Sequence, residues 1–325
     1  MGIGIRGVAV FVALAAVVQH QPAQAQDYPS RAVTMIVPWA PGGAVDTLAR
    51  IAAPKLADRL GKPVVVENRP GGGSTIGTAL GAKAPPDGYT LGMPGSGSMA
   101  ISPAMYKSLP YDPVKDVMPI ALVGRVPFVL IVNKDLPIKT VPELIAYAKT
   151  NKLNYGSGGA GSPHHLYGEL LKSMTGIEMT HVPYKGSADA IKDVVAGHIQ
   201  LMFSDTAPSI PLIRSGNVRV LGLSTKTRLV NAPEIVPLHE MGVPGFEAAG
   251  WFMVASSAGT PQPIVDRLHK EFKEVMGLQE VQEAVNRTGV VPIVSPSIQE
   301  LNTFVASERE RWGKVVHQAG LAGTQ

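Results

Sequence analysis

The sequence predicts an α/β protein with two lobes, and three observations support this prediction. After Gln26, short apolar strands alternate with amphipathic helices, an order typical of mostly parallel central sheets covered by helices on both faces. Charged residues make up 17% and hydrophobic residues 45% of the 325 residues, a composition typical of a globular protein. The strand and helix units separate near residues 125 and 250. We therefore expect lobe 1 to contain residues 26–125 and 251–325, lobe 2 to contain residues 126–250, and a hinge to join them.

The first part of the chain predicts strands and helices in turn. Its longest helix runs from Val45 to Leu60 and ends at Gly61, which serves as a C-cap. Pro54 lies inside this helix and removes one backbone hydrogen bond, so we expect a kink or a local break there. The other elements expected here are strands at 32–37, 64–67, 89–93, 120–124 and 128–132 and a helix at 75–83.

The rest of the chain continues the alternation. Thr140 and Glu143 have the spacing of a capping box, which begins a helix that extends to about residue 149. Ser162-Pro163 begins another helix, which ends at Gly176. The other elements expected here are strands at 153–155, 199–203, 218–223 and 250–255 and helices at 187–196, 263–276, 278–287 and 298–317.

The N-terminus predicts a cleavable signal peptide over residues 1–25. One positive charge within 1–6 precedes an apolar stretch over 7–18, and Ala23-Gln24-Ala25 follows. Small residues spaced in this way are typical of a signal peptidase site, so we expect cleavage before Gln26 and a soluble protein in the periplasm. An uncleaved membrane anchor is the alternative that this segment leaves open.

Composition and missing motifs argue against several classes of function. The net charge of +4 is spread along the chain, and Lys and Arg form no run with aromatic residues, so we expect no nucleic-acid partner. The absence of Cys excludes disulfides and thiolate chemistry. His164-His165 lacks the HExxH pattern of a metal site, and no convincing Ser/His/Asp set is present. We therefore expect neither an enzyme nor a metal or cofactor.

Two segments have the form of a strand, a Gly-rich turn and a helix. They cover residues 35–43 and 153–162, one in each expected lobe. The first turn of a helix has unpaired N–H groups and a partial positive charge, and glycine lets the backbone approach a ligand closely. The two loops are therefore candidates to hold one negatively charged solute from both sides. The alternative is that both are only tight, well-capped turns.

The second loop also matches a dinucleotide-binding pattern. Gly156-x-Gly158-x-x-Gly161 lies between a strand and a helix, and Glu178 follows about twenty residues later. An exported oxidoreductase that binds its cofactor at this loop is therefore an alternative function. The predicted export argues against it, because nicotinamide cofactors are scarce outside the cytoplasm.

Seven motifs occur together along nearly the whole mature chain. They are Tyr28–Arg31, Val37–Gly43 with Asp46, Val64–Gly73, Pro86–Leu91, Leu109–Pro113, His181–Gly186 and Arg311–Val316. In this order they resemble the receptors of tripartite tricarboxylate transporters, often called Bug proteins. Two positions depart from the family pattern, since Ser96 stands where Asn is common and Pro54 is unusual.

The resemblance implies a type II periplasmic-binding-protein fold, in which two α/β lobes close on a mono-, di- or tricarboxylic acid or a related small acid. It implies delivery of the acid to the membrane permease subunits of the transporter, and we expect a monomer. A sensor that signals to a membrane partner is a further alternative. The ligand-binding residues that the resemblance implies are Trp39, Ala40, Pro41, Gly42, Gly43, Ser96, Ser98, Ser157, Gly158, Gly161, Ser162, His165, Asp205 and Thr206.

Overall fold

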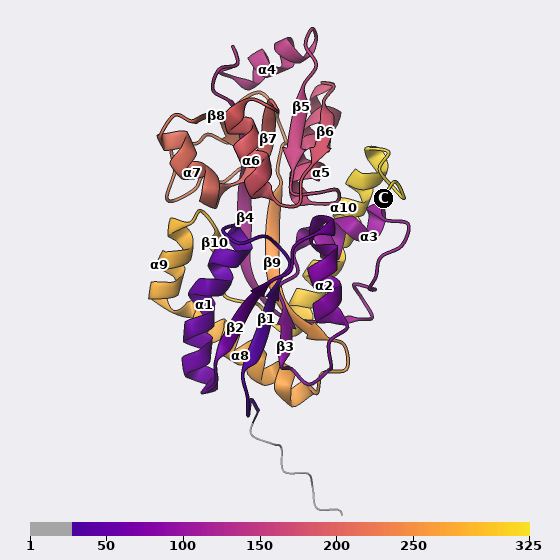
Figure 1. Cartoon of the computed structure of the whole chain (residues 1–325), viewed down its shortest axis with the longest axis vertical. Coiled ribbons are helices and arrows are strands. Elements are labelled where there is room, and N and C mark those ends of the chain that lie inside the picture. Colours follow the sequence, from indigo (N-terminus) through magenta and orange to yellow (C-terminus); the bar gives the residue numbers. More distant parts are fainter. Residues whose placement is uncertain (1–27) are drawn as a thin grey trace, which may run out of the picture.

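The computed structural model, which describes residues 28–325, contains two α/β lobes that share one long strand (Figure 1). This strand is β4 (Val117–Asn133). Its residues 117–127 pair with β9 (Ala249–Ser257), and its residues 128–133 pair with β7 (Leu201–Asp205) and β8 (Val218–Leu223). The predicted boundary at residue 125 lies inside β4, and the one at residue 250 lies near the start of β9. The division of the chain into lobes at these residues stays a prediction. The predicted signal peptide lies outside the described residues.

The sequence predicted two strands, 120–124 and 128–132, where the structure has the single strand β4. The pairing of β4 with β9 shifts register between Pro119 and Ala121 and again between Leu122 and Gly124. Such irregularities bend a strand without ending it. Almost every residue of β4 is buried, Arg125 being exposed, so the strand continues because both of its faces are covered.

Lobe 1 is built on a sheet with the strand order β2-β1-β3-β9-β4, and β10 also pairs with β4. Strands β1 (Val33–Val37), β2 (Val64–Asn68) and β3 (Thr90–Gly92) pair in parallel. Strand β10 (Val291–Pro292) is antiparallel to β4. The helical elements that follow in this part of the chain are α1 (Ala44–Leu60), η1 (Gly72–Ser74), α2 (Thr75–Ala82), η2 (Gly97–Ile101), α3 (Ser102–Met105), α8 (Gln262–Gly277), α9 (Gln279–Arg287) and α10 (Ile298–Gln318).

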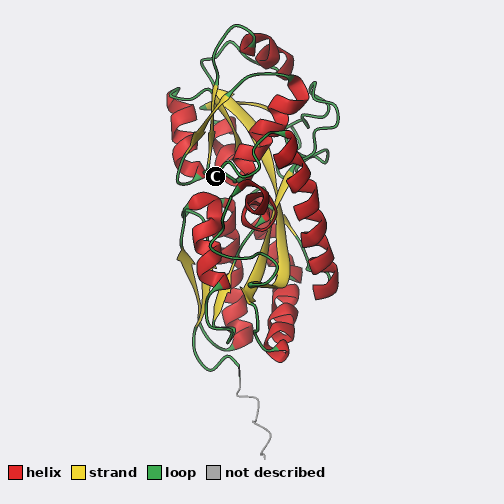
Figure 2. Cartoon of the chain, turned by 90° about the vertical axis from the view of Figure 1, so that its right-hand side faces the viewer, coloured by secondary structure: helices red, strands yellow, loops and turns green. Residues whose placement is uncertain are grey.

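Lobe 2 is built on β8, the end of β4, β7, β5 (Asn154–Ser157) and β6 (Thr180–Pro183). Strand β5 is parallel to both β6 and β7. Its helices are α4 (Val141–Ala148), α5 (Pro163–Thr175), α6 (Ser187–Ala196) and α7 (Thr206–Arg214). Figure 2 shows helices on both sides of the strands, as the alternation in the sequence predicted.

The sheets are more mixed than the prediction of mostly parallel strands. Strands β1, β2 and β3 run parallel, as do β5, β6 and β7, but β4 is antiparallel to β7, β8, β9 and β10, and β9 is antiparallel to β3. The chain leaves lobe 1 along β4 and comes back along β9. An outgoing strand and a returning neighbour necessarily run in opposite directions.

Helix α1 runs without a break through Pro54, where a kink or break was expected. Pro54 lies on the exposed side of the helix. Water can therefore satisfy the carbonyl group that lacks its N–H partner.

Helix α10 contacts both lobes. The Trp312 ring stacks on Tyr167 of α5, with 5.4 Å between ring centres. The buried carboxylate of Glu308 accepts hydrogen bonds from the indole N–H groups of Trp251 in β9, at 2.9 Å, and Trp312, at 3.1 Å. These bonds satisfy a buried charge and fasten α10 to β9, while the stacked rings attach it to lobe 2.

Helix α5 packs on its sheet through a stack of rings. The His165 ring lies parallel to the ring of His181 in β6, with 3.8 Å between centres, and Tyr155 of β5 continues the stack. Burial lowers the pKa of His165 to about 4. Burial, with the neighbouring His165, lowers the pKa of His181 to about 3. Both rings are therefore neutral in the folded protein at physiological pH.

Two glycines inside helices predict opposite effects of the same substitution. A Cβ at Gly168 in α5 would lie 2.3 Å from Cε2 of Tyr155, whereas a Cβ at Gly313 in α10 meets no described atom within 4 Å. We expect Gly168→Ala to lower the free energy of unfolding by about 1–3 kcal/mol through overpacking. Gly313→Ala should raise it by up to about 1 kcal/mol through helix propensity. Urea denaturation followed by circular dichroism measures both, and equal effects would contradict the described packing.

The stacked histidines predict a loss of stability in acid. Below pH 6.5, the ordinary pKa of histidine, the unfolded chain binds protons at His165 and His181 that the folded protein does not bind. Their contribution to stability is therefore complete above pH 6.5 and is lost as the pH falls toward 4 and then 3. We expect the melting temperature to fall over this range and His181→Gln to flatten the fall. His317→Gln is the control, because it removes an exposed imidazole outside this stack.

Candidate ligand-binding site

A cleft between the lobes is bordered by the starts of four helices. Its lining includes Gly42–Val45 at the start of α1, Pro163–His164 at α5, Gly186–Ala188 at α6, and Asp205 with Pro208 at α7. Phe128 of β4 and Phe252 of β9 complete the lining. The cleft has about 580 Å³ of space between atoms, part of it open to solvent. The aligned peptide dipoles at four helix starts favour a negatively charged ligand, and the first turns of α1 and α6 also contain N–H groups at every position, whereas Pro163 of α5 and Pro208 of α7 have none.

The loop before α1 is shaped by the carboxylate of Asp46. Asp46 Oδ2 accepts a hydrogen bond from Gly42 N at 2.9 Å, and Oδ1 accepts bonds from Asn68 at 2.9 Å and from Arg50 at 3.0 Å. Burial raises the pKa of Asp46, but these bonds outweigh burial and hold the pKa below its usual value. Gly42 has a φ of +86°, which glycine adopts at little cost. The carboxylate therefore fixes the loop, while the first-turn N–H groups that follow Gly43 border the cleft.

The opposite wall contains His164. Its Nε2 lies 3.2 Å from Asp205 Oδ2, and the ring meets Phe128 edge-on at 5.0 Å and Trp39 at 6.3 Å between centres. Nδ1 of His164 and Nε1 of Trp39 are buried without a partner among the described residues. A buried polar atom without a partner is costly, so both atoms are candidates for a bond to a ligand or to water in the cleft.

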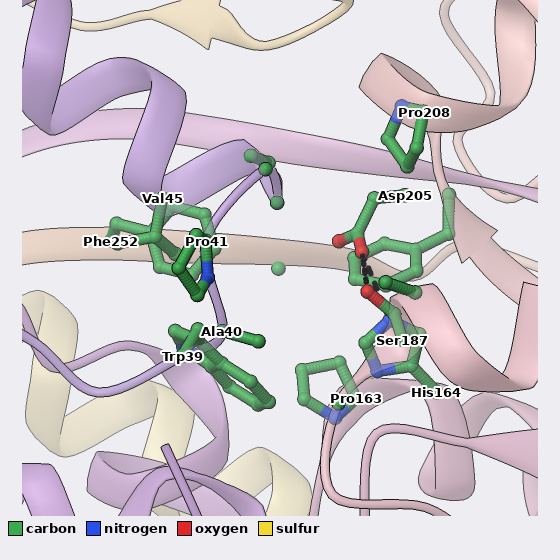
Figure 3. A pocket seen from close by; sticks show the side chains of 17 residues that line it. Trp39, Ala40, Pro41, Val45, Pro163, His164, Ser187, Asp205, Pro208 and Phe252 are labelled. Carbon is green, nitrogen blue, oxygen red and sulfur yellow. Dashed lines mark hydrogen bonds and ion pairs between the residues drawn. The ribbon is translucent and has the colours of Figure 1, made fainter. Parts of the chain in front are cut away.

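Asp205, the residue before α7, accepts two hydrogen bonds on one oxygen. Oδ2 accepts from His164 at 3.2 Å and from the Ser187 hydroxyl at 2.8 Å, which joins the starts of α5, α6 and α7. Burial raises the pKa of Asp205, but the charge and hydrogen bond of His164 and the bond from Ser187 outweigh burial and lower the pKa. Figure 3 shows the carboxylate facing the side of the cleft formed by Trp39, Pro41 and Val45.

The structure brings some of the predicted site residues together and separates others from the cleft. The predicted residues that line the cleft are Trp39, Ala40, Pro41, Gly42, Gly43 and Asp205. The predicted residues that do not line it are Ser96, Ser98, Ser157, Gly158, Gly161, Ser162, His165 and Thr206.

The Gly-rich loop of lobe 2 lies behind the cleft wall. Ser157 Oγ accepts a hydrogen bond from Gly159 N at 3.0 Å and lies 2.6 Å from His181 Nε2. A Cβ at Gly158 would lie 3.3 Å from Ser187 N and 3.4 Å from the His164 ring. The loop thus supports the two residues that hold Asp205, and its glycines leave room for them.

Other predicted site residues form ring stacks or hydrogen bonds with residues outside the cleft lining, and one is buried beside the cleft. His165 turns away from the cleft because its ring stacks on His181. Thr206 donates a hydrogen bond to Gly289 O at 2.9 Å, and Ser98 Oγ lies within bonding distance of Gly95 O at 3.4 Å. The buried Ser96 hydroxyl has no partner among the described residues. It lies 3.6 Å from the position of a Cβ at Gly250, which lines the cleft.

Sequence reasoning missed several residues of the cleft. They are Ala44, Val45, Phe128, Pro163, His164, Gly186, Ser187, Ala188, Pro208, Gly250 and Phe252. The residues from Gly186 to Ala188 could have been found from the sequence. Gly186 directly precedes the helix expected at 187–196, just as glycines precede the helices after the two predicted loops. No comparable signal distinguishes His164 from His165.

Internal packing accounts for the dinucleotide-like glycines. A Cβ at Gly156 would lie 2.5 Å from Ile199 Cδ1, and a Cβ at Gly161 would lie 2.9 Å from Ser102 Oγ. Gly161 also has a φ of +75°. Each position therefore requires glycine for reasons inside the protein, which removes the main support for a cofactor at this loop.

The two lobes touch beside the cleft. A Cβ at Gly73 of η1 would lie 2.3 Å from Ala160 O in the Gly-rich loop of lobe 2. Tyr106 Oη, which follows α3, lies 3.2 Å from Ala160 O and 3.4 Å from Gly72 O. A glycine and a tyrosine hydroxyl therefore hold the loops of the two lobes against each other.

Two kinds of feature are absent from the described residues. Within residues 28–325, no helix has the length and apolar character needed to cross a bilayer. The same part of the chain contains no cluster of three or more His, Asp and Glu side chains arranged to hold a metal ion.

Sequence similarity links this chain to one protein family and to individual bacterial proteins. Residues 48–321 match the model of the tripartite tricarboxylate transporter family receptor. The chain is 35% identical to BugT of Bordetella pertussis, with 96% of each chain covered. It is 36% identical to the UPF0065 protein in the tcbD-tcbE intergenic region of a Pseudomonas species, with 99% of this chain and 97% of that protein covered.

Solved structures share the fold. The periplasmic binding protein BugD has a TM-score of 0.86 at 32% identity, covering 91% of this chain and 99% of its own. Rpa4515 of R. palustris, solved with adipate, has a TM-score of 0.87 at 38% identity and the same coverage of 91% and 99%. MatC of Rhodopseudomonas palustris, solved with bound malate, has a TM-score of 0.83 at 30% identity, covering 89% of this chain and 100% of its own.

These similarities confirm two predictions made from the sequence. The two-lobed α/β fold is that of periplasmic binding proteins. The resemblance seen in the motifs extends over most of the chain. The chain belongs to the receptor family of the tripartite tricarboxylate transporters.

Proposed function

We propose that this protein is a periplasmic receptor that binds a small organic acid between its lobes and performs no chemistry on it. The observation that carries the proposal is the convergence of four helix starts from both lobes on one cleft. Such a site attracts a carboxylate through backbone N–H groups and needs no arginine. Adipate and malate in two of the similar structures agree with an acid as the ligand.

The required affinity is within reach of such a site. A hydrogen bond to a charged group contributes about 1.5–3 kcal/mol, and micromolar binding corresponds to about 8 kcal/mol. Roughly four such bonds reach this value before the cost of ordering the two lobes is subtracted. One helix start offers two or three suitable donors, so tight binding depends on donors from both lobes.

Closure of the lobes explains how both sets of donors reach one ligand. We infer that β4 and β9, the strands that lead from one lobe toward the other, act as the hinge. The contact between Gly73 and Ala160, with Tyr106 beside it, would then form when the cleft closes and break when the ligand leaves. Direct backbone contact of this kind demands a glycine, since any side chain would hold the loops apart.

Family membership supports the proposed delivery and location. In this proposal the closed receptor carries the acid to the membrane permease subunits of a tripartite tricarboxylate transporter. The protein reaches the periplasm through a signal peptide over residues 1–25, which is removed, and acts there as a monomer.

A hydrolase at this cleft is disfavoured by the geometry of its polar residues. Ser187, His164 and Asp205 are the residue types of a catalytic triad, but both the serine and the histidine bond to the same oxygen of Asp205. In a triad the histidine bonds to the serine and removes its proton. Here the serine hydroxyl is directed at the aspartate, so no base activates it.

Ligand-induced stabilisation tests the proposed function. We expect particular small carboxylic acids to raise the melting temperature, because a ligand present at a hundred times its dissociation constant stabilises the folded state by about 2.7 kcal/mol. NAD at the same concentration should leave it unchanged. Differential scanning fluorimetry with a panel of acids, followed by mass spectrometry of co-purified ligands, makes the comparison. Stabilisation by NAD and by none of the acids would contradict the receptor function.

A glycine substitution tests the closure mechanism. Gly73→Ala places a Cβ against Ala160 O, so we expect at least a tenfold loss of affinity for an acid found in the panel while the protein remains folded. Gly61→Ala is the matched control, because Gly61 has a similar φ of +69° but no described neighbour within 4 Å. Isothermal titration calorimetry compares the two variants. Native affinity in Gly73→Ala would show that the loop contact plays no part in binding.

A further inference from the structure

The polar side chains of the cleft lie together on one wall. Apart from the indole N–H of Trp39, the polar side-chain groups of the described lining belong to His164, Ser187 and Asp205. These three bond to one another, because Asp205 Oδ2 accepts hydrogen bonds from His164 Nε2 at 3.2 Å and from Ser187 Oγ at 2.8 Å. Among the described side chains of the lining, this wall alone therefore offers a hydrogen-bond acceptor to a ligand.

The rest of the lining consists of glycines and apolar side chains. Strand β4 contributes the ring of Phe128, and strand β9 contributes the ring of Phe252. Figure 3 shows Phe252, Val45 and Trp39 together on the side of the cleft opposite Asp205. A ligand that fills the cleft therefore meets rings and a branched aliphatic side chain over most of its length.

Gly250 of β9 leaves the Phe128 ring accessible to a ligand. Both residues line the cleft, and a Cβ at Gly250 would lie 3.1 Å from Cε2 of Phe128. A side chain at this position would therefore stand against the ring. The glycine thus enlarges the apolar surface that the cleft presents to the body of a ligand.

The apolar surface and the polar wall act differently on the body of a ligand. A hydroxyl group loses its water when the lobes close, and beside rings no side chain replaces the lost hydrogen bond. Each hydroxyl left unpaired lowers the affinity by roughly five- to a hundredfold, whereas a buried methylene group raises it by about fourfold. A single hydroxyl can still bond to the polar wall, so an acid with one hydroxyl avoids this loss.

We propose that the cleft selects carboxylic acids whose body is a hydrocarbon chain or ring, and discriminates against sugar acids, which carry hydroxyl groups on most of their carbons. This inference rests on the proposed function and names the class of acid. Carboxylates of the ligand bind at the helix starts, while its body lies against Trp39, Phe128 and Phe252. The number of hydroxyl groups, rather than the number of carboxylates, then decides which acids bind tightly.

Three matched pairs of acids test the inference. They are hexanoate with gluconate, cyclohexanecarboxylate with quinate, and adipate with galactarate. The members of each pair have the same carbon skeleton and the same charge and differ only in hydroxyl groups. Isothermal titration calorimetry measures each acid with the purified protein at pH 7. In the pair that binds best, we expect the hydrocarbon acid to bind at least tenfold tighter than the sugar acid or quinate.

Two variants test whether the apolar wall causes this preference. Val45→Thr keeps the shape of the side chain but adds a hydroxyl to the lining, so the preference should shrink at least threefold. Val65→Thr makes the same change at an exposed position of β2 outside the lining and should leave the preference unchanged. The preference is a ratio of two affinities within one variant, so a change in the folded fraction does not alter it.

The outcomes distinguish this inference from the function on which it rests. If the native protein binds the hydroxylated acids as tightly as their partners, the inference is wrong and the receptor function stands. If other acids in the stability panel bind but none of the three hydrocarbon acids does, the result is the same. If no acid of any kind binds, both fail. A preference that stays unchanged in a folded Val45→Thr also overturns the inference, and the native series decides it if that variant does not fold.

Discussion

The two hydrogen bonds that converge on Asp205 Oδ2 hold the candidate site together. They come from His164 at the start of α5 and Ser187 at the start of α6, and Asp205 itself precedes α7. Three helices that begin far apart in the sequence therefore begin at one point in space. Without this carboxylate, three partially positive helix starts would face one another without a counter-charge.

The same bonds explain the role of the Gly-rich loop of lobe 2. Gly158 stands within 3.3 Å of Ser187 N and 3.4 Å of the His164 ring, measured from the position of an added Cβ. The absence of a side chain there lets α5 and α6 approach closely enough to share Asp205. The loop thus acts on the cleft indirectly, by positioning its wall, whereas the loop before α1 borders the cleft directly.

Contact between the lobes beside the cleft involves both backbone and side-chain groups. Gly73 meets Ala160, and Tyr106 Oη lies close to carbonyl groups of both lobes. The Thr206 hydroxyl donates a hydrogen bond to Gly289 O, and Trp39 meets His164 edge-on across the cleft. Helix α10 contacts both lobes through Glu308 and Trp312, so it joins them independently of these loops.

Local interactions let the sequence determine most helices and strands of this protein. Capping boxes at Thr140 and Ser297 set the starts of α4 and α10, and Gly61 ends α1, because caps act within a few residues. The loop before α1 was also predictable, since its glycines and its helix start adjoin in the chain. The motifs, taken together, identified the family.

Tertiary structure alone decided which residues face the cleft. His164 rather than His165 lines it because the His165 ring stacks on His181, a partner in another strand. Ser187 and Asp205 meet because β5, β6 and β7 lie in one sheet and bring the helices that follow them to the same edge. The joining of two predicted strands into β4 likewise depends on burial by both lobes. Contacts between residues distant in the chain leave no periodicity in the sequence, and for that reason only the folded structure specifies them.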